Sequence, residues 1–289
     1  MTTIVPGPTA LPKRRGAMRR LLQARAGVIS IAFLVALVLV AALAPWLAPH
    51  DPAQQSLGNQ LQGPSWDHWL GTDGVGRDVL SRIVHAARVA LLAPAISVGI
   101  AVVLGVPSGL VAGYWRGRVD QLMSILADTL LSIPPIVLAV SIVAVMGPGL
   151  TTVMAAVGIV YAPRLFRVVR AATLSAREEL YIESANSIGC SSGRILLSHV
   201  LPNVASPLLV QVTLLMGFAL IAEASLSFLG LGVQLPDASW GSMLRAAYDD
   251  KFRAPYAVVP PGVALTLTVL AFNTLGDALR DAVTARRRQ

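Results

Sequence analysis

Six long apolar runs are the feature of this sequence that most restricts its fold. They cover roughly residues 26–48, 87–113, 121–146, 150–170, 204–230 and 257–277. A helix rises 1.5 Å per residue, so about 20 apolar residues cross the hydrocarbon core of a bilayer. A helix also satisfies its own backbone polar groups there, where no water can do so. The sequence therefore predicts an all-α, polytopic membrane protein with six transmembrane helices.

The composition supports this class and argues against a soluble domain. Hydrophobic residues make up 55% of the chain and charged residues only 13%, whereas soluble domains carry about 25% charged residues. The net charge is +8, but the basic residues gather at the ends of the apolar runs, which indicates membrane orientation. We expect contact with the lipid bilayer and none with nucleic acid.

The distribution of basic residues predicts the orientation. Seventeen of the 23 Lys and Arg residues flank one side of the predicted spans, and six flank the other. Because basic residues are retained on the cytoplasmic side, both termini are predicted to be cytoplasmic in a multi-pass protein of the cell membrane. Residues 1–25 then form a basic cytoplasmic arm before the six-helix domain of residues 26–289. A loop at about 178–203 is cytoplasmic, and segments at about 49–86 and 231–256 face outward.

The cytoplasmic loop contains the stretch "YIESANSIGCSSGRILLSHVLPN", residues 181–203. Tyr181, Ile182, Ala185 and Ile188 repeat with helical spacing, and a second apolar stripe follows Gly189. The glycines and serines between the stripes favour a turn. The stretch predicts a helix–turn–helix that either offers a short helix to a partner or rests on lipid.

This stretch resembles the EAA motif of ABC-importer permeases, E-A-A-x3-G-x9-I-x-L-P. The spacing is kept throughout, with Ser184 in place of an alanine and His199 in place of the isoleucine. In that superfamily the motif forms a coupling helix that docks on a cytoplasmic ATPase subunit. The resemblance therefore implies an ATPase-coupling role for Tyr181, Glu183, Ser184, Ala185, Gly189, His199, Leu201 and Pro202.

Other segments resemble the dipeptide/oligopeptide branch of these permeases. They are "HWLGTDGVGRDVLSRIVHAAR", "ADTLLSIPPIVLAV", "AEASLSFLGLGVQLPDASWGSML" and "LTVLAFNTLGDALRDA". The resemblance covers roughly residues 20–285 and is closest to the C-type subunit. It implies a type I importer fold and half of a translocation pathway for dipeptides or oligopeptides. It also implies a homologous second permease, two cytoplasmic ATPase subunits or domains, and an extracytoplasmic substrate-binding protein.

The chain itself is predicted to be neither an enzyme nor a cofactor-binding protein. A P-loop requires a lysine directly after a glycine, and neither Lys13 nor Lys251 follows one. ATP and magnesium are therefore assigned to the partner ATPases. One cysteine and four scattered histidines form none of the common metal-binding spacings, so no metal site is predicted.

Two acidic residues fall inside predicted spans, where ionisable groups point to function. Asp128 and Glu223 are candidates for lining the pathway, for contacting a peptide ammonium group, or for fixing helix packing. A proton-coupled secondary transporter is the alternative function, but it needs an acid–base relay or internal repeats, and the sequence shows neither. In the third span, Pro134 and Pro135 predict a kink.

The first outward segment carries a charged group. Asp73 is predicted to cap the helix that follows it. Arg77 and Asp78 are candidates either for a structural role in this segment or for contact with the binding protein.

Overall fold

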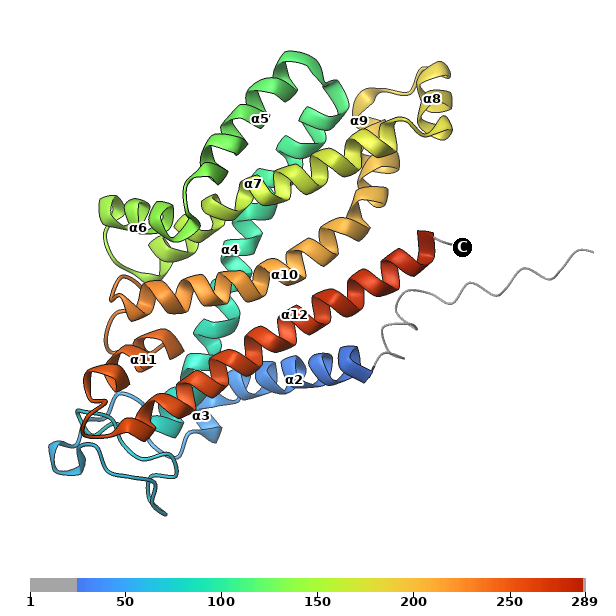
Figure 1. Ribbon diagram of the computed structural model, residues 1–289. Helices are drawn as coiled ribbons and strands as arrows, with labels where there is room; N and C mark the ends of the chain where they lie inside the picture. Colours follow the sequence, from blue (N-terminus) through green and yellow to red (C-terminus); the bar gives the residue numbers. More distant parts are fainter. Residues whose placement is uncertain (1–24, 288–289) are drawn as a thin grey trace, which may run out of the picture.

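The computed structural model describes residues 25–287, and this part of the chain is helical without any strand (Figure 1). Thr72 and Asp78 form one isolated β-bridge. The predicted basic arm lies outside the described residues apart from Arg25. The elements are α2 (Arg25–Ala42), α3 (Ala44–Leu47), η1 (Leu57–Asn59), α4 (Val79–Trp115), α5 (Gly117–Ser132), α6 (Pro135–Met146), α7 (Leu150–Arg177), α8 (Leu180–Ser187), α9 (Ser192–Ile195), the π-helical turn η2 (Leu196–Val200), α10 (Leu201–Phe228), α11 (Trp240–Asp249), η3 (Pro255–Val258) and α12 (Val259–Arg287).

Five helical segments are long and apolar enough to cross a membrane. These are α2, α4, α7, the run from Ser192 to Phe228, and the run from Pro255 to Val283. The pair α5 and α6 makes a sixth candidate, with a bend of 92° between the two helices. The all-helical, polytopic architecture is therefore confirmed, and the count reaches six when the bent pair is taken as one span.

The third predicted span is broken, which corrects the expectation of a single kinked helix. Ile133 and Pro134 are extended, with ψ of 131° and 129°. Each precedes a proline, whose ring disfavours helical geometry in the residue before it. With 16 and 12 residues, α5 and α6 are about 24 Å and 18 Å long, and neither alone crosses a core of about 30 Å.

The start of α4 also differs from the expectation. The helix begins at Val79, and its N-cap is Asp78, whose side chain accepts a hydrogen bond from the Ser81 amide. The prediction that Asp73 caps this helix is wrong. Its carboxylate instead accepts from the amides of Val75 and Arg77 and forms an ion pair of 2.7 Å with the Arg77 guanidinium. Asp73 therefore closes the loop that leads to the helix.

The closest helix packing joins α4 and α7. A Cβ atom added at Gly105 would lie 2.6 Å from the Ala162 carbonyl oxygen, and one at Gly109 would lie 2.8 Å from that of Phe166. Gly113, one turn further, would place its Cβ 2.7 Å from the Thr173 side chain. Small residues at every fourth position let two membrane helices approach at backbone distance. The glycines of α4 thus form a strip that α7 covers.

The bundle has two distinct ends (Figure 1). α8, α9, the start of α2 and the C-terminal part of α12 lie at one end, called here the α8 end. α3, α11 and the loop between α3 and α4 lie at the opposite, α11 end. At this second end the buried indole of Trp240 donates a hydrogen bond of 3.2 Å to the Ile83 carbonyl, which fixes α11 to α4.

Replacing Gly109 by leucine is expected to destabilise the fold because the side chain would push α7 away from α4. Overpacking costs about 1–3 kcal/mol, and each kcal/mol lowers the thermal midpoint of a chain of this size by about 2–4 °C. Gly99→Leu is the matched control, since Gly99 is exposed on the same helix with no atom within 4 Å of an added Cβ. Thermal unfolding in detergent measures both, and equal midpoints would contradict the expectation.

Candidate functional site

The loop at the α8 end forms the predicted helix–turn–helix, with α8 followed by α9 and η2. Ile182 and Ala185 of α8 are buried, and so are Ile195, Leu196 and Val200 after the turn. They share one apolar cluster with the ends of α4 and α7, through residues such as Leu110 and Val169. The hairpin is therefore packed on the bundle through its inner face.

The turn after α8 is a Schellman motif built on Gly189. This residue has a φ of +82°, the left-handed region that glycine adopts without steric cost. The Cys190 amide then donates to the Ala185 carbonyl at 3.0 Å, the six-to-one bond that defines the motif. Cys190 also packs against the cluster that contains Ala185. Gly189 thus ends α8 and sets the direction of the chain after it.

The outer face of α8 is exposed and partly apolar. Leu180 and Ile188 are 78% and 79% exposed, and Ser184 and Glu183 also face solvent. Leu180, Ser184 and Ile188 follow one another at intervals of four residues, so they share one face of the helix. The helical spacing places Ile188 on the apolar face of Ile182 and Ala185, but Ile188 comes one residue after α8 ends and does not share their burial.

The second half of the EAA-like stretch is joined to the first by polar contacts. Asn203 donates a hydrogen bond of 2.6 Å to the Tyr181 hydroxyl and another of 2.9 Å to the His199 carbonyl. The Tyr181 and His199 rings meet edge to face at 6.4 Å. Partial burial and the Glu179 carboxylate raise the pKa of the Tyr181 phenol. Leu201 and Pro202 start α10, and Pro202 is exposed.

Two further contacts fix the base of the hairpin to the bundle. The Arg177 guanidinium donates to the Tyr114 carbonyl at 2.6 Å, at the end of α4. Arg116 and Glu178 form an ion pair of 2.8 Å between the end of α4 and the end of α7. Sequence analysis did not single out these residues, because the partners lie more than 60 positions apart. Their pairing follows from the α4–α7 contact.

The two acidic residues in the spans differ in their surroundings. Asp128 on α5 and Arg167 on α7 form an ion pair of 2.5 Å, and both side chains are more than half exposed. Asp128 therefore has a basic partner on the neighbouring helix. Glu223 on α10 is 3% exposed and accepts a hydrogen bond of 2.7 Å from the Ser227 hydroxyl. The structure thus places Asp128 on an open flank and Glu223 inside the bundle.

At the α11 end, Arg77 and Asp78 are buried, with 8% and 2% of each residue exposed. Arg77 is engaged by Asp73, and Asp78 caps α4, bonds to the Ser81 hydroxyl and lies 2.9 Å from His68. Both residues therefore make structural contacts inside the chain.

Comparison with known proteins places the chain in a family. Residues 105–289 match the family described as binding-protein-dependent transport system inner membrane component. Residues 14–64 match the N-terminal TM domain of oligopeptide transport permease C. The chain belongs to the binding-protein-dependent permease family. It is thus a membrane permease component of an ABC importer, and the predicted membership in the dipeptide/oligopeptide branch is confirmed.

Relatives cover nearly the whole chain. The dipeptide transport system permease protein DppC of Alkalihalophilus pseudofirmus is 40% identical over 95% of this chain and 90% of its own length. The glutathione transport system permease protein GsiD of Pectobacterium atrosepticum is 42% identical over 92% of this permease and 88% of its own length. The GsiD protein of Escherichia coli O157:H7 is 43% identical over 87% of this permease and 83% of its own length.

The fold has a solved counterpart. A chain of the MetNI methionine ABC transporter, determined in inward-facing conformations, matches with a TM-score of 0.59 over 71% of this permease and 96% of that chain. The sequences are 20% identical, so this likeness concerns the fold. It confirms the expected ABC-permease architecture.

Gly189→Val is expected to loosen α8, because a side chain in the left-handed region costs about 1–2 kcal/mol. Such a cost corresponds to roughly 5–30-fold faster opening of the helix, read as amide hydrogen exchange across residues 180–190. Gly193→Val is the matched control, since Gly193 is exposed in the same hairpin, without a positive φ and with open space around it. Equal exchange in the two variants would contradict the role given to Gly189.

Proposed function

We propose that this permease forms half of the translocation pathway of an ATP-driven importer for short peptides, and that α8 is its coupling helix. The observation that carries the proposal is the two-sided character of α8. One face is buried against the bundle through Ile182 and Ala185, and the other offers Leu180, Glu183 and Ile188 to solvent. Exposed apolar groups beside polar ones are typical of a surface that binds another protein.

The contacts on the inner side of α8 suit it to transmit movement. Ile182 and Val200 pack with Leu110 and Val169, so a displaced α8 presses on the ends of α4 and α7. The Arg177 and Arg116 contacts join those two ends to each other. Since packed cores switch between discrete arrangements more readily than they deform, a docking partner can bias how the spans are tilted. ATP binding and hydrolysis in the ATPase subunits would supply that bias.

The exposed flank with Asp128 and Arg167 is proposed to face the pathway and the second permease. Asp128 lies roughly 16 Å along α5 from its first residue, which is too deep for an exposed charge to meet lipid without a large cost. Leu122 and Leu126 are 71% and 61% exposed on the same helix. A homologous permease covering this side would bury the apolar residues and leave the ion pair at a water-filled passage. Glu223 is then proposed to hold the end of α10 in place beside that passage.

The cargo is inferred from the relatives. DppC and GsiD are named for dipeptide and glutathione transport, and these cargoes are short and carry both ammonium and carboxylate groups. An ion pair such as Asp128–Arg167 offers one partner for each charge. We therefore propose zwitterionic peptides of two or three residues, delivered by an extracytoplasmic binding protein to the α11 end.

The orientation completes the proposal. Among the described residues, the loops and helix ends at the α8 end carry most of the basic residues that flank the spans, and the positive-inside rule assigns this end to the cytoplasm. The same rule assigns both termini to the cytoplasm. The importer then lies in the cell membrane with α8 toward the ATPases, and this chain catalyses no hydrolysis itself.

Cells that express the complete importer are expected to take up a labelled dipeptide, and Ile188→Asp is expected to reduce this uptake at least about tenfold. Burying an isoleucine contributes about 1.5–3 kcal/mol, and 1.4 kcal/mol is a factor of ten in affinity. Co-purification of the ATPase subunits should fall in parallel. Ser198→Asp, at an exposed position on η2 of the same hairpin, controls for the added charge and should leave both readouts unchanged.

Competition separates the cargo from the coupling. Unlabelled dipeptide should compete for uptake and free amino acids should not; competition by amino acids alone would reject peptide cargo while leaving the coupling role intact. Normal uptake and normal ATPase retention in Ile188→Asp would reject α8 as the coupling helix, and the hairpin would then rest on lipid.

The orientation is tested with reporters fused after Gly63 and, separately, after Gln289. A reporter active only outside should be active after Gly63, and one active only inside should be active after Gln289. The physical reason is the seventeen-to-six excess of basic residues. A cytoplasmic signal from the Gly63 fusion would invert the proposed topology.

A further inference from the structure

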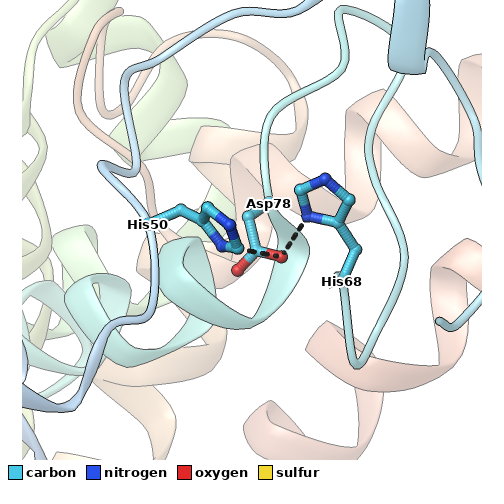
Figure 2. A group of neighbouring side chains, drawn as sticks. All are labelled: His50, His68 and Asp78. Carbon is cyan, nitrogen blue, oxygen red and sulfur yellow. Dashed lines mark hydrogen bonds and ion pairs between the residues drawn. The ribbon is translucent and has the colours of Figure 1, made fainter. Parts of the chain in front are cut away.

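Two histidines and an aspartate converge at the α11 end, although sequence analysis predicted no metal site. His50 follows α3, His68 lies in the loop between α3 and α4, and Asp78 caps α4. Figure 2 shows the two imidazole rings on either side of the Asp78 carboxylate. One potential ligand atom from each residue lies within 4.8 Å of the other two. The histidines are 18 positions apart, so only the folded loop brings them together.

The distances are close to those of a metal site. Asp78 Oδ1 lies 2.9 Å from His68 Nδ1 and 3.9 Å from His50 Nδ1. Two atoms bound at about 2.0–2.1 Å to one tetrahedral zinc ion lie about 3.3 Å apart. Side-chain movements on the order of 1 Å would therefore bring all three ligands onto one ion. The rings are already 4.8 Å apart between centroids and tilted by 36°.

Asp78 is held so that one oxygen stays directed at the histidines. Its Oδ2 accepts hydrogen bonds of 2.7 Å from both the amide and the hydroxyl of Ser81. The Ser81 hydroxyl in turn accepts a hydrogen bond of 3.1 Å from the His50 amide. One fully buried serine thus positions two of the three residues, which is the kind of support that orients metal ligands.

The cluster is also accessible to an ion. It lines a cavity of about 290 Å³ together with Asp51, Ser56 and Asp67. The side chain of His50 is 39% exposed, that of His68 13% and that of Asp78 1%. The Asp78 carboxylate supplies the negative charge, and the two acids beside it make the approach favourable for a cation.

We propose that His50, His68 and Asp78 bind one first-row divalent transition-metal ion, with zinc as the best match. Imidazole and carboxylate ligands suit zinc, and three protein ligands leave a fourth position for water or an incoming group. The ion would connect two points of the loop between α3 and α4, at His50 and His68, to the N-terminal cap of α4 at Asp78. The site rests on these residues alone, so it stands or falls independently of the proposed cargo and coupling.

The test uses the full-length permease in nanodiscs, purified with a tag free of histidine and stripped of metal. After zinc is added back and the excess is removed, we expect one zinc ion per chain by elemental analysis. When cobalt is added in place of zinc, we expect a visible absorption band of tetrahedral type. His50→Ala and His68→Ala should each weaken zinc binding at least about 100-fold, because even residues that only orient ligands contribute 10–100-fold. Ser81→Ala should weaken zinc binding by about 10–100-fold, because Ser81 only orients the ligands.

His199→Ala is the matched control, because it removes an imidazole from η2, the turn that follows α9 at the α8 end. This variant should bind zinc as the parent does. His50→Ala is the safest variant for folding, since the His50 side chain is 39% exposed and lies 3.9 Å from the Asp78 carboxylate. Binding below one ion per chain, or binding that His50→Ala and His68→Ala leave unchanged, would overturn the site. His68 and Asp78 would then form only a hydrogen-bonded pair.

Discussion

The contact between α4 and α7 is the interaction on which the rest of the structure depends. Gly105, Gly109 and Gly113 leave no side chain between the helices, so the backbones meet directly. In a bilayer no hydrophobic force drives one apolar helix onto another, and close van der Waals packing has to do so instead. The pair is the most extensive helix contact in the described chain, and α6 and α10 pack against it in one apolar cluster.

The two ends of this helix pair carry the two proposed sites. At one end, Arg116 and Arg177 fasten α4 to α7, and the α8 hairpin packs over both. At the other end, the cap of α4 is the Asp78 carboxylate, which also approaches His50 and His68. A tilt of the pair therefore moves both surfaces at once. This geometry links the proposed docking of an ATPase at the α8 end to access at the α11 end.

The charged groups of the helices also have partners on neighbouring residues. Asp128 and Arg167 pair across α5 and α7, and the Asp120 carboxylate accepts a hydrogen bond of 2.7 Å from Arg170 on the same two helices. Glu223 is buried and accepts a hydrogen bond from Ser227, one turn further along α10. Acids in a membrane need such partners. The exposed pair differs from the buried acid because it lies on a flank that the proposed second permease would cover.

The sequence by itself determined the class of the protein. Apolar run length and the EAA-like spacing depend on local composition and helical period, and these led to the helical membrane fold, the family and the hairpin at residues 181–203. The prolines at 134 and 135 also marked the place where α5 breaks from α6. Only the tertiary structure decided that Asp78 rather than Asp73 caps α4, and that Ile188 faces outward. It also decided that His50 and His68 meet at Asp78. Each of these depends on which distant segments pack together, and residue spacing along the chain does not encode that.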